Sequence, residues 1–173
     1  MAEEVILVDA QDQALGLMEK MEAHRQGLLH RAFSVFVLNT KGELLLQQRA
    51  AHKYHSGGLW TNTVCSHPRE GESVEDAAHR RLEEEMGFDC PIEKAFEFTY
   101  RAELDKGMIE HEYDHLFTGW YDEDPKPNPA EVMDFRWQLP SAVEQDLQDH
   151  PEHYTAWFKI IFQRFTTTLK QTQ

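Results

Sequence analysis

The sequence has few cysteines, few cations and no long apolar run, and each shortage excludes a class of protein. Cys65 and Cys90 are its 2 cysteines among 173 residues, too few for a disulfide-stapled scaffold. No stretch approaches the ~20 apolar residues that a membrane-spanning helix needs. The first residues also show no basic segment followed by an apolar one, as a secretory signal would. We therefore expect a cytoplasmic protein that does not cross a membrane.

Positive charge is scarce as well. The chain has 17 Lys and Arg residues against 31 Asp and Glu residues, which gives a formal net charge of -14. Such a charge disfavours nucleic acid and anionic membranes as partners. An anionic small molecule is still compatible, because a bound divalent cation and a few focused side-chain cations set the local field whatever the total charge.

Length and apolar patterning predict one domain, residues 1–173, of α+β class with a central mixed sheet. The hydrophobic fraction of 40% is enough for one ordinary core, and no internal repeat or low-complexity segment is visible. The expected strands are 5–8, 33–38, 43–48, 59–64, 92–101, 108–121 and 135–139. The second and third should form a hairpin through a turn ending at Gly42. The expected helices are 17–24, 73–87 and 151–170.

The helix predicted most clearly follows Ser73, a capping residue, and ends at Gly87. Val74, Ala78 and Leu82 recur at helical spacing and indicate a buried stripe. The acidic residues of its last turn are candidates for a functional role as well as a structural one, although a run of charged residues on a helix usually forms a solvated face.

Residues 61–68, Thr-Asn-Thr-Val-Cys-Ser-His-Pro, place a thiol and an imidazole two positions apart. As a catalyst, Cys65 would supply a thiol with an ordinary pKa of ~8.5 that can donate or accept a proton once its surroundings shift it. The residue types equally allow Cys65 and His67 to bind zinc together. Cys90, close to Gly87, is predicted to be a packing residue.

Glu110 and Glu112 flank His111 on a predicted strand, so both carboxylates should lie on one face and the imidazole on the other. Two like charges this close indicate a metal site or an acid/base group tuned by its neighbour. The alternative is a solvated strand face.

His24 and His30 would lie on different faces of a continuous helix and can converge only if the chain bends at Gly27. Each histidine taken by itself is best interpreted as structural. Together with His67 and the Glu110 and Glu112 carboxylates, they would form a nitrogen and oxygen ligand set that suits Mn²⁺, Mg²⁺ or Zn²⁺.

Residues 66–88 resemble the Nudix box, in which clustered helix carboxylates bind a divalent metal that in turn holds a diphosphate. The positions in register are Glu72, Arg80, Leu82, Glu84, Glu85 and Gly87. Ser66 replaces the first glycine of the hydrolase consensus, and Arg81 replaces a glutamate. Loss of that carboxylate weakens the case for hydrolysis.

Residues 61–68, the altered box, residues 98–102 and residues 110–113 together resemble type I isopentenyl-diphosphate delta-isomerase, and the likeness covers nearly the whole chain. The resemblance implies a Nudix-like mixed sheet packed between helices. It also implies the reversible interconversion of isopentenyl diphosphate and dimethylallyl diphosphate in isoprenoid biosynthesis, by protonation of one carbon and deprotonation of another.

Carried over to matching positions, the resemblance implies that Cys65 and Glu112 are the proton-transfer groups and that Tyr100 assists Glu112. It implies a site for Mn²⁺ or Zn²⁺ with the ligands His24, His30, His67, Glu110 and Glu112, to which the zinc interpretation would add Cys65. It implies that Glu85 helps to bind Mg²⁺ with the substrate diphosphate. The implied diphosphate contacts are Lys20, Arg49, Lys53 and Arg81.

Trp157 aligns with a tryptophan of the family whose ring would face a substrate cation, the alternative being ordinary core. The chief competing function is a Nudix hydrolase that cleaves a nucleoside diphosphate derivative, and another is a non-catalytic binding module. The sequence is compatible with a monomer or a homodimer.

Overall fold

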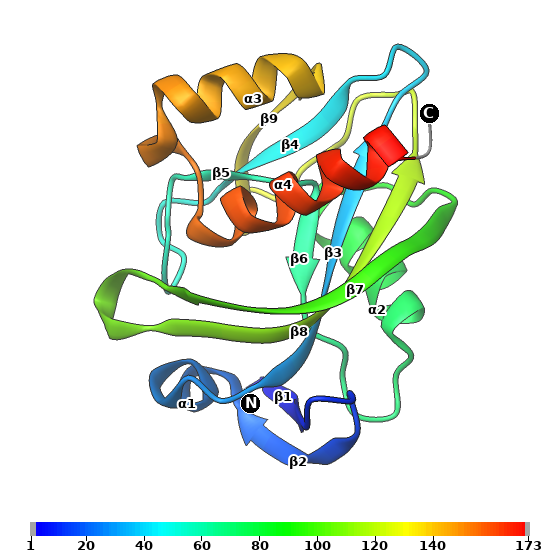
Figure 1. Ribbon diagram of the computed structural model, residues 1–173. Helices are drawn as coiled ribbons and strands as arrows, with labels where there is room; N and C mark the ends of the chain where they lie inside the picture. Colours follow the sequence, from blue (N-terminus) through cyan, green and yellow to red (C-terminus); the bar gives the residue numbers. More distant parts are fainter. Residues whose placement is uncertain (1–2, 172–173) are drawn as a thin grey trace.

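The computed structural model describes residues 3–171, the side chains of residues 170 and 171 excepted, and contains one nine-stranded mixed sheet with helices on both faces (Figure 1). Strands β3 (His30–Leu38) and β8 (Ile109–Trp120) pair in parallel. The other strand pairs within the described residues are antiparallel. The predicted α+β class and the mixed sheet between helices are confirmed. No helix in the described part of the chain is long and apolar enough to span a membrane.

The first residues form a hairpin of β1 (Glu4–Val8) and β2 (Ala14–Glu19), followed by α1 (Lys20–Gln26). The helix expected from Leu17 is therefore wrong at its start. Leu17 pairs with Ile6 across the hairpin, and the helix begins only after Glu19, whose carboxylate accepts a hydrogen bond from the Glu22 amide. Strand pairing outweighs the helical spacing of a short apolar segment.

The remaining strands are β4 (Leu44–Arg49), β5 (Trp60–Thr61), β6 (Val64–Ser66), β7 (Ile92–Glu103) and β9 (Val132–Gln138). The turn at Gly42 forms with a φ of 78°. However, β3 and β4 pair only at Leu38 and Leu44, because β3 pairs along its length with β6 and β8 instead. The predicted hairpin is therefore present only at its turn.

The later helices are α2 (Val74–Arg81), α3 (Pro140–Asp149) and α4 (Ala156–Gln171). A π-helical turn, η1 (Leu82–Met86), continues α2 to Gly87, which has a φ of 72°. The Ser73 hydroxyl accepts from the Asp76 amide, so the predicted cap and stop of this helix are confirmed. The sequence interpretation missed α3. Two 3₁₀ turns, η2 (Asp105–Gly107) and η3 (Pro151–His153), complete the described elements.

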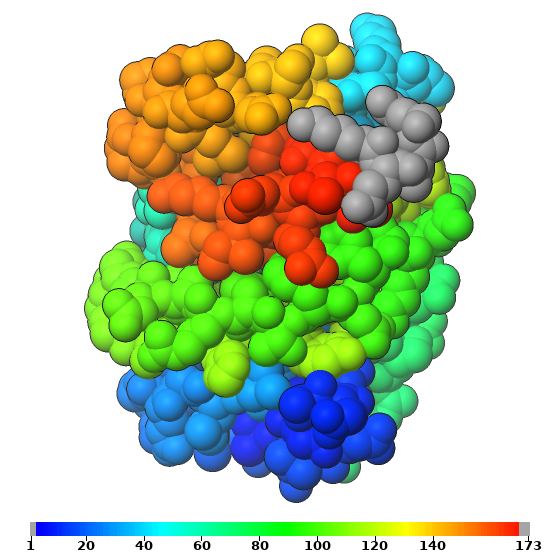
Figure 2. All heavy atoms as spheres, viewed as in Figure 1, coloured from blue at the N-terminus to red at the C-terminus, as the bar shows by residue number. Residues whose placement is uncertain are grey.

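The sheet separates two apolar cores. Phe33, Val35 and Val37 pack with α2 and η1 on one face, whereas Phe36 packs under α4 with Trp157 on the other. Because side chains alternate along a strand, His30 and Ser34 share the face of Phe36. Figure 2 shows side chains of α3, α4 and β7 covering this side of the molecule.

Candidate active site

Strand β3 brings the two predicted proton-transfer groups to one face of the sheet. Ser34 pairs with Cys65 on β6, and His30 pairs with Glu112 on β8. Directly paired residues share a face, and Ser34 and His30 share one by alternation. Cys65 and Glu112 therefore lie on the same face, one on each side of β3.

Both residues line one cavity of about 20 Å³, room for roughly one water molecule. Its walls are Arg49, Tyr54, His55, Cys65, Ser66, His67, Glu110, Glu112 and Trp157. Glu112 is buried and Cys65 is half-buried at this cavity, and a bound guest requires its walls to move apart.

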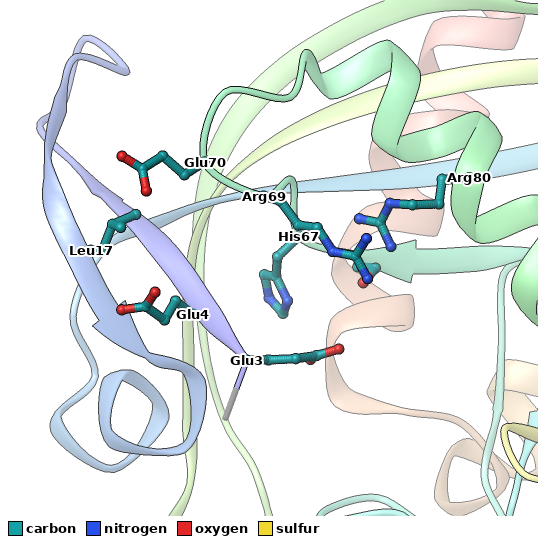
Figure 3. Close-up of a pocket in the computed structure, with 8 residues that line it drawn as sticks. Glu3, Glu4, Leu17, His67, Arg69, Glu70 and Arg80 are labelled. Carbon is teal, nitrogen blue, oxygen red and sulfur yellow. The ribbon is translucent and has the colours of Figure 1, made fainter. Parts of the chain in front are cut away.

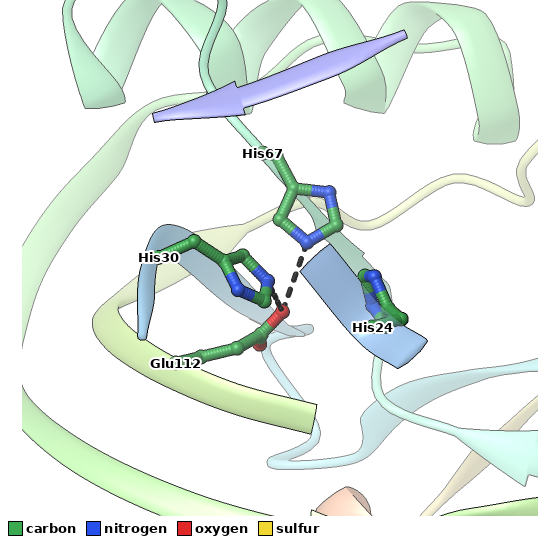
Figure 4. A group of neighbouring side chains, drawn as sticks. All are labelled: His24, His30, His67 and Glu112. Atoms are coloured by element: carbon green, nitrogen blue, oxygen red, sulfur yellow. Dashed lines mark hydrogen bonds and ion pairs between the residues drawn. The ribbon is translucent and has the colours of Figure 1, made fainter. Parts of the chain in front are cut away.

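The three histidines named from the sequence converge on Glu112 (Figure 4). The Glu112 Oε2 atom lies 3.1 Å from His30 Nε2 and 2.9 Å from His67 Nε2. The His24 ring lies 5.1 Å from the His30 ring, centroid to centroid. Gly27 ends α1 with a φ of 68°, which provides the bend that the sequence required. The donor atoms of these four side chains lie within 4.8 Å of one another.

The histidine tautomers suit a divalent cation. The Nδ1–H of His24 donates to the Lys20 carbonyl at 2.7 Å, and that of His30 donates to the Leu28 carbonyl at 2.9 Å. Each ring therefore presents Nε2 to the carboxylates, as metal-binding imidazoles oriented by backbone oxygens do. The Nε2 of His24 is buried and has no hydrogen-bond partner among residues 3–171. This donor set fits the implied metal.

The carboxylates are buried and are held by a tyrosine. Tyr100 Oη lies 2.6 Å from Glu110 Oε2 and 2.7 Å from Glu112 Oε1. Glu110 and Glu112 are only 6% and 4% exposed, which excludes a solvated strand face. His111 lies on the other face, where its Nδ1 contacts the Gly27 carbonyl.

The two glutamates titrate in opposite directions. Burial, together with the charge of Glu112, raises the pKa of Glu110. Burial also opposes ionisation of Glu112, but hydrogen bonds with His30 and His67 outweigh it and lower the pKa of this carboxyl well below its usual range. Glu112 is therefore the more acidic carboxyl of the pair.

Cys65 remains a protonated thiol. Burial, with the negative charge of Asp114 as the next cause, raises the pKa of Cys65 far above its usual range. The Sγ–H donates to Asn62 Oδ1 at 3.0 Å. Ser34 Oγ lies 3.5 Å from Sγ and donates to the buried Asp114 carboxylate. The sequence interpretation did not include Asn62, Ser34 or Asp114.

The Cys65 thiol belongs to neither of the His/Glu ligand clusters around His24 in the described part of the chain. This favours acid/base chemistry over zinc binding for Cys65. Cys90 is buried in the opposite core against α2, so its predicted packing role is confirmed.

The four cations expected to contact diphosphate line a second cavity, which shares Cys65 and His67 with the first. They are Lys20, Arg49, Lys53 and Arg81. Glu85 lines the same cavity, and its Oε2 lies 3.2 Å from Arg81 Nε. Two unpredicted carboxylates also contact this set. Glu131 pairs with Lys53 at 2.5 Å, and Glu3 pairs with Lys20 at 2.6 Å.

Trp157 belongs to the core and also forms a wall of the site. It is 2% exposed and packs in the core beneath α4. Its ring lines the cavity that contains Cys65, and the Arg49 guanidinium lies 5.1 Å from the ring centroid. The two alternatives weighed for Trp157 are therefore compatible.

A larger hollow of about 420 Å³ adjoins the site at Ser66 and His67 (Figure 3). Glu3 and Glu4, where β1 begins, lie across it from Arg69 and His67. Arg80, on its far wall, makes hydrogen bonds of 2.8 and 3.0 Å to Glu72. Among the metal-ligand candidates, His67 lines this hollow.

Comparison with known proteins identifies the family. The NUDIX domain family matches residues 28–158. The chain is 52% identical over 161 residues to "Isopentenyl-diphosphate Delta-isomerase 2" of Photorhabdus laumondii, covering 93% of this chain and 91% of that protein. It is also 52% identical to "Isopentenyl-diphosphate Delta-isomerase" of Pectobacterium atrosepticum, with 93% and 90% covered.

Solved structures support the same fold. The crystal structure of DR0079 from Deinococcus radiodurans superposes with a TM-score of 0.80 at 18% identity, covering 94% of this chain and 98% of that one. The MutT protein from Methanosarcina mazei superposes with a TM-score of 0.66 at 23% identity, covering 82% and 96%. The fold, the matched domain and the close relatives agree, and the chain belongs to the isopentenyl-diphosphate Delta-isomerase family of NUDIX-domain proteins.

Proposed function

We propose that this protein interconverts isopentenyl diphosphate and dimethylallyl diphosphate. The observation that carries the proposal is the cavity whose walls include Cys65, Glu112 and Trp157. Relatives that share about half of the sequence bear the name of this activity. In the reaction the terminal alkene carbon gains one proton and the neighbouring methylene loses one, so the double bond moves and the atom count is unchanged.

Cys65 and Glu112 are the groups that exchange these protons. The thiol carries a proton and the carboxylate is ionised, so the pair holds one proton to give and one site to receive. Tyr100 donates to the Glu112 carboxylate and orients it toward the cavity. The two groups flank β3 on the same face of the sheet, so the hydrocarbon tail would lie between them once the cavity walls move apart.

Protonation of the alkene produces a tertiary cation that water would capture. A closed cavity excludes water, and an aromatic ring stabilises positive charge without supplying a nucleophile. A cation over a desolvated indole gains ~2 kcal/mol, which corresponds to about thirtyfold in rate when the gain is confined to the transition state. Trp157, buried beside Cys65, serves this role.

The second cavity binds the diphosphate. Lys20, Arg49, Lys53 and Arg81 supply positive charge at one end of the site, and guanidinium groups match phosphate oxygens in two-pronged fashion. Glu85 is placed to help hold Mg²⁺ against the diphosphate. Anchoring the anion fixes the short tail between the proton-transfer groups, which binding of the tail itself could not achieve.

Mn²⁺ or Zn²⁺ would bind to His24, His30, His67, Glu110 and Glu112. When bound, such an ion supplies positive charge that offsets the repulsion of the two buried carboxylates. The imidazoles already present Nε2 toward this position, so loading requires little rearrangement of their tautomers.

Incubation with isopentenyl diphosphate and Mg²⁺ in deuterated water tests the proposal. We expect deuterium to enter the five-carbon tail while the double bond moves, with no phosphate released. Release of phosphate from nucleoside diphosphate derivatives, with isopentenyl diphosphate unchanged, would instead establish the hydrolase. Arg81 disfavours that outcome, because its guanidinium donates hydrogen bonds of 3.2 Å to Glu84 and Glu85. In a hydrolase these carboxylates would instead be available to bind metal.

A further inference from the structure

A fourth imidazole faces the buried carboxylates from a loop. His55 lies between β4 and β5 and is 1% exposed. Its Nε2 lies 3.9 Å from Glu110 Oε1, and the Nε2 of His24 lies 3.5 Å from the same oxygen. The donor atoms of His24, His55 and Glu110 lie within 4.8 Å of one another. They form a second ligand cluster that shares His24 with the first.

The Nε2 of His55 is buried and has no hydrogen-bond partner among residues 3–171. A buried polar atom without a partner costs free energy, so its retention requires an explanation. The other ring nitrogen, Nδ1, lies 3.1 Å from Ser56 Oγ. His55 thus resembles His24 and His30 in having Nδ1 beside an oxygen, here a hydroxyl that can donate or accept, and Nε2 toward Glu110.

The surrounding loop holds His55 in this orientation. Arg49 donates to the His55 carbonyl at 3.1 Å, and the Ser56 amide donates to Asp105 at 3.0 Å. Ser56 adopts a φ of 53°, a left-handed conformation that is unfavourable for a residue with a side chain. At Gly57 a Cβ would lie 2.3 Å from the Ala51 carbonyl oxygen. The backbone is strained and closely packed where it aims His55 inward.

We propose that His55 is a further ligand of the divalent-metal centre, binding through Nε2 on the side of His24 and Glu110. The inference rests on the metal centre of the proposed function and adds a residue to it. The competing explanation is packing alone, because the ring also contacts Trp157 edge-on at 5.4 Å.

Metal binding to His55→Gln distinguishes the two explanations. Mn²⁺ and Co²⁺ affinities are measured by competition with a chelator, and the visible spectrum of bound Co²⁺ reports the ligand set. We expect one ion per wild-type chain at this centre, and a loss of affinity of about tenfold or more in His55→Gln with a changed Co²⁺ spectrum. His52→Gln is the matched control, because His52 belongs to the same loop but contacts the Ala130 carbonyl instead. It should behave as the wild type.

Equal affinity and an unchanged Co²⁺ spectrum in His55→Gln would overturn the proposal. His55→Asp, which supplies an anionic carboxylate where His55→Gln supplies a neutral amide, should bind the ion more tightly than His55→Gln, and the reverse order would also count against the proposal. For each variant, the rise in Tm on adding metal is measured from the Tm of the same variant without metal. The test therefore stays valid if a substitution lowers the stability of the metal-free protein. If wild-type protein bound no ion at this centre, the metal centre itself would fail, which is distinct from failure of His55 alone.

Discussion

Glu112 joins the histidine cluster to the tyrosine. It interacts with His30, His67 and Tyr100, so its carboxylate belongs both to the proposed metal site and to the cavity. Cys65 has no such shared duty, because its thiol contacts Asn62 and Ser34 and belongs to neither ligand cluster described above. Substitutions at these two residues should therefore differ in their effect on metal binding.

Cys65→Ser should lower kcat/KM for isomerisation by about 10²- to 10⁴-fold, the usual contribution of a proton-transfer group, while leaving metal content unchanged. Glu112→Gln should lower both. The measurements are turnover of isopentenyl diphosphate and metal analysis of the same samples. Cys90→Ser is the control, since Cys90 lies in the opposite core and its loss should leave turnover intact. Full activity of Cys65→Ser would remove the thiol from the reaction.

Asp114 should make folding stability depend on pH. Burial, followed by the charge of Glu112, raises its pKa well above the usual range. A group with a raised carboxyl pKa binds its proton more tightly in the folded state, so its stabilisation is present at low pH and is lost as pH rises toward the folded pKa. Asn cannot titrate but can still accept the hydrogen bond from Ser34. The Asp114→Asn variant should therefore lack this pH-dependent loss of stability.

The difference should appear in denaturant unfolding of metal-free protein between pH 5 and 8. Over the pH range in which Asp114 is protonated in the folded state but ionised in the unfolded state, the free energy of unfolding of the wild type should fall by up to about 1.4 kcal/mol per pH unit relative to that of Asp114→Asn. Parallel stability curves for the two proteins across this range would mean that Asp114 is already ionised when buried.

The helix that carries the box ends sharply because of one glycine. Gly87 has a φ of 72°, and the chain beyond it returns to contact η1 through the amides of Lys126 and Asn128, which donate to the Met86 and Glu85 carbonyls. This contact holds the π-helical turn that carries Glu85. A side chain at position 87 would interfere with it.

Gly87→Ala should destabilise the fold by more than the ~1–2 kcal/mol that a left-handed conformation costs, because its Cβ would lie 2.3 Å from the Lys126 carbonyl oxygen. Gly107→Ala is the matched control. Gly107 has a similar φ of 74° but no heavy atom within 4 Å of the added Cβ. Thermal unfolding of both variants measures the difference. Equal losses of stability in the two variants would show that the backbone at Lys126 moves away from the added Cβ without a further loss of free energy.

The elements differ in how far local sequence determined them. The helix from Ser73 to Gly87 was predicted with both of its ends, because its cap, stripe and stop are local signals. Helix α3 was missed, because its buried face consists of little more than Val143, too few apolar residues for a period to be recognised. The start of α1 was placed wrongly, because β2 is defined by its pairing with β1.

A bound ion would connect distant parts of the fold. His24 comes from α1, His30 from β3, His67 follows β6, and Glu112 belongs to β8. A ligand that binds only the folded state stabilises it by RT ln(1 + [L]/Kd), which is about 2.7 kcal/mol at a hundredfold excess over Kd. The metal should therefore influence both stability and activity.

Exhaustive chelation should abolish isomerase turnover and lower Tm, and Mn²⁺ or Zn²⁺ should restore both. Thermal unfolding at several metal concentrations measures the stabilisation, with Mg²⁺ supplied separately for the diphosphate. Full turnover after complete removal of metal would contradict the role assigned to the His and Glu ligands.

The amino-acid sequence by itself determined the family motifs and the ends of the helix from Ser73 to Gly87, because these depend on residue types at fixed positions. It also determined that Glu110 and Glu112 share a face, because side chains alternate along a strand with a period of two residues. Tertiary structure decided the rest. Only the pairing of β3 with β6 and β8 brings Cys65 and Glu112 to one cavity. Only the loop after β4 aims His55 at Glu110, and only the sheet brings Asp114 within hydrogen-bond distance of Ser34 Oγ, next to the thiol. These contacts join residues far apart in the chain, and no local period encodes them.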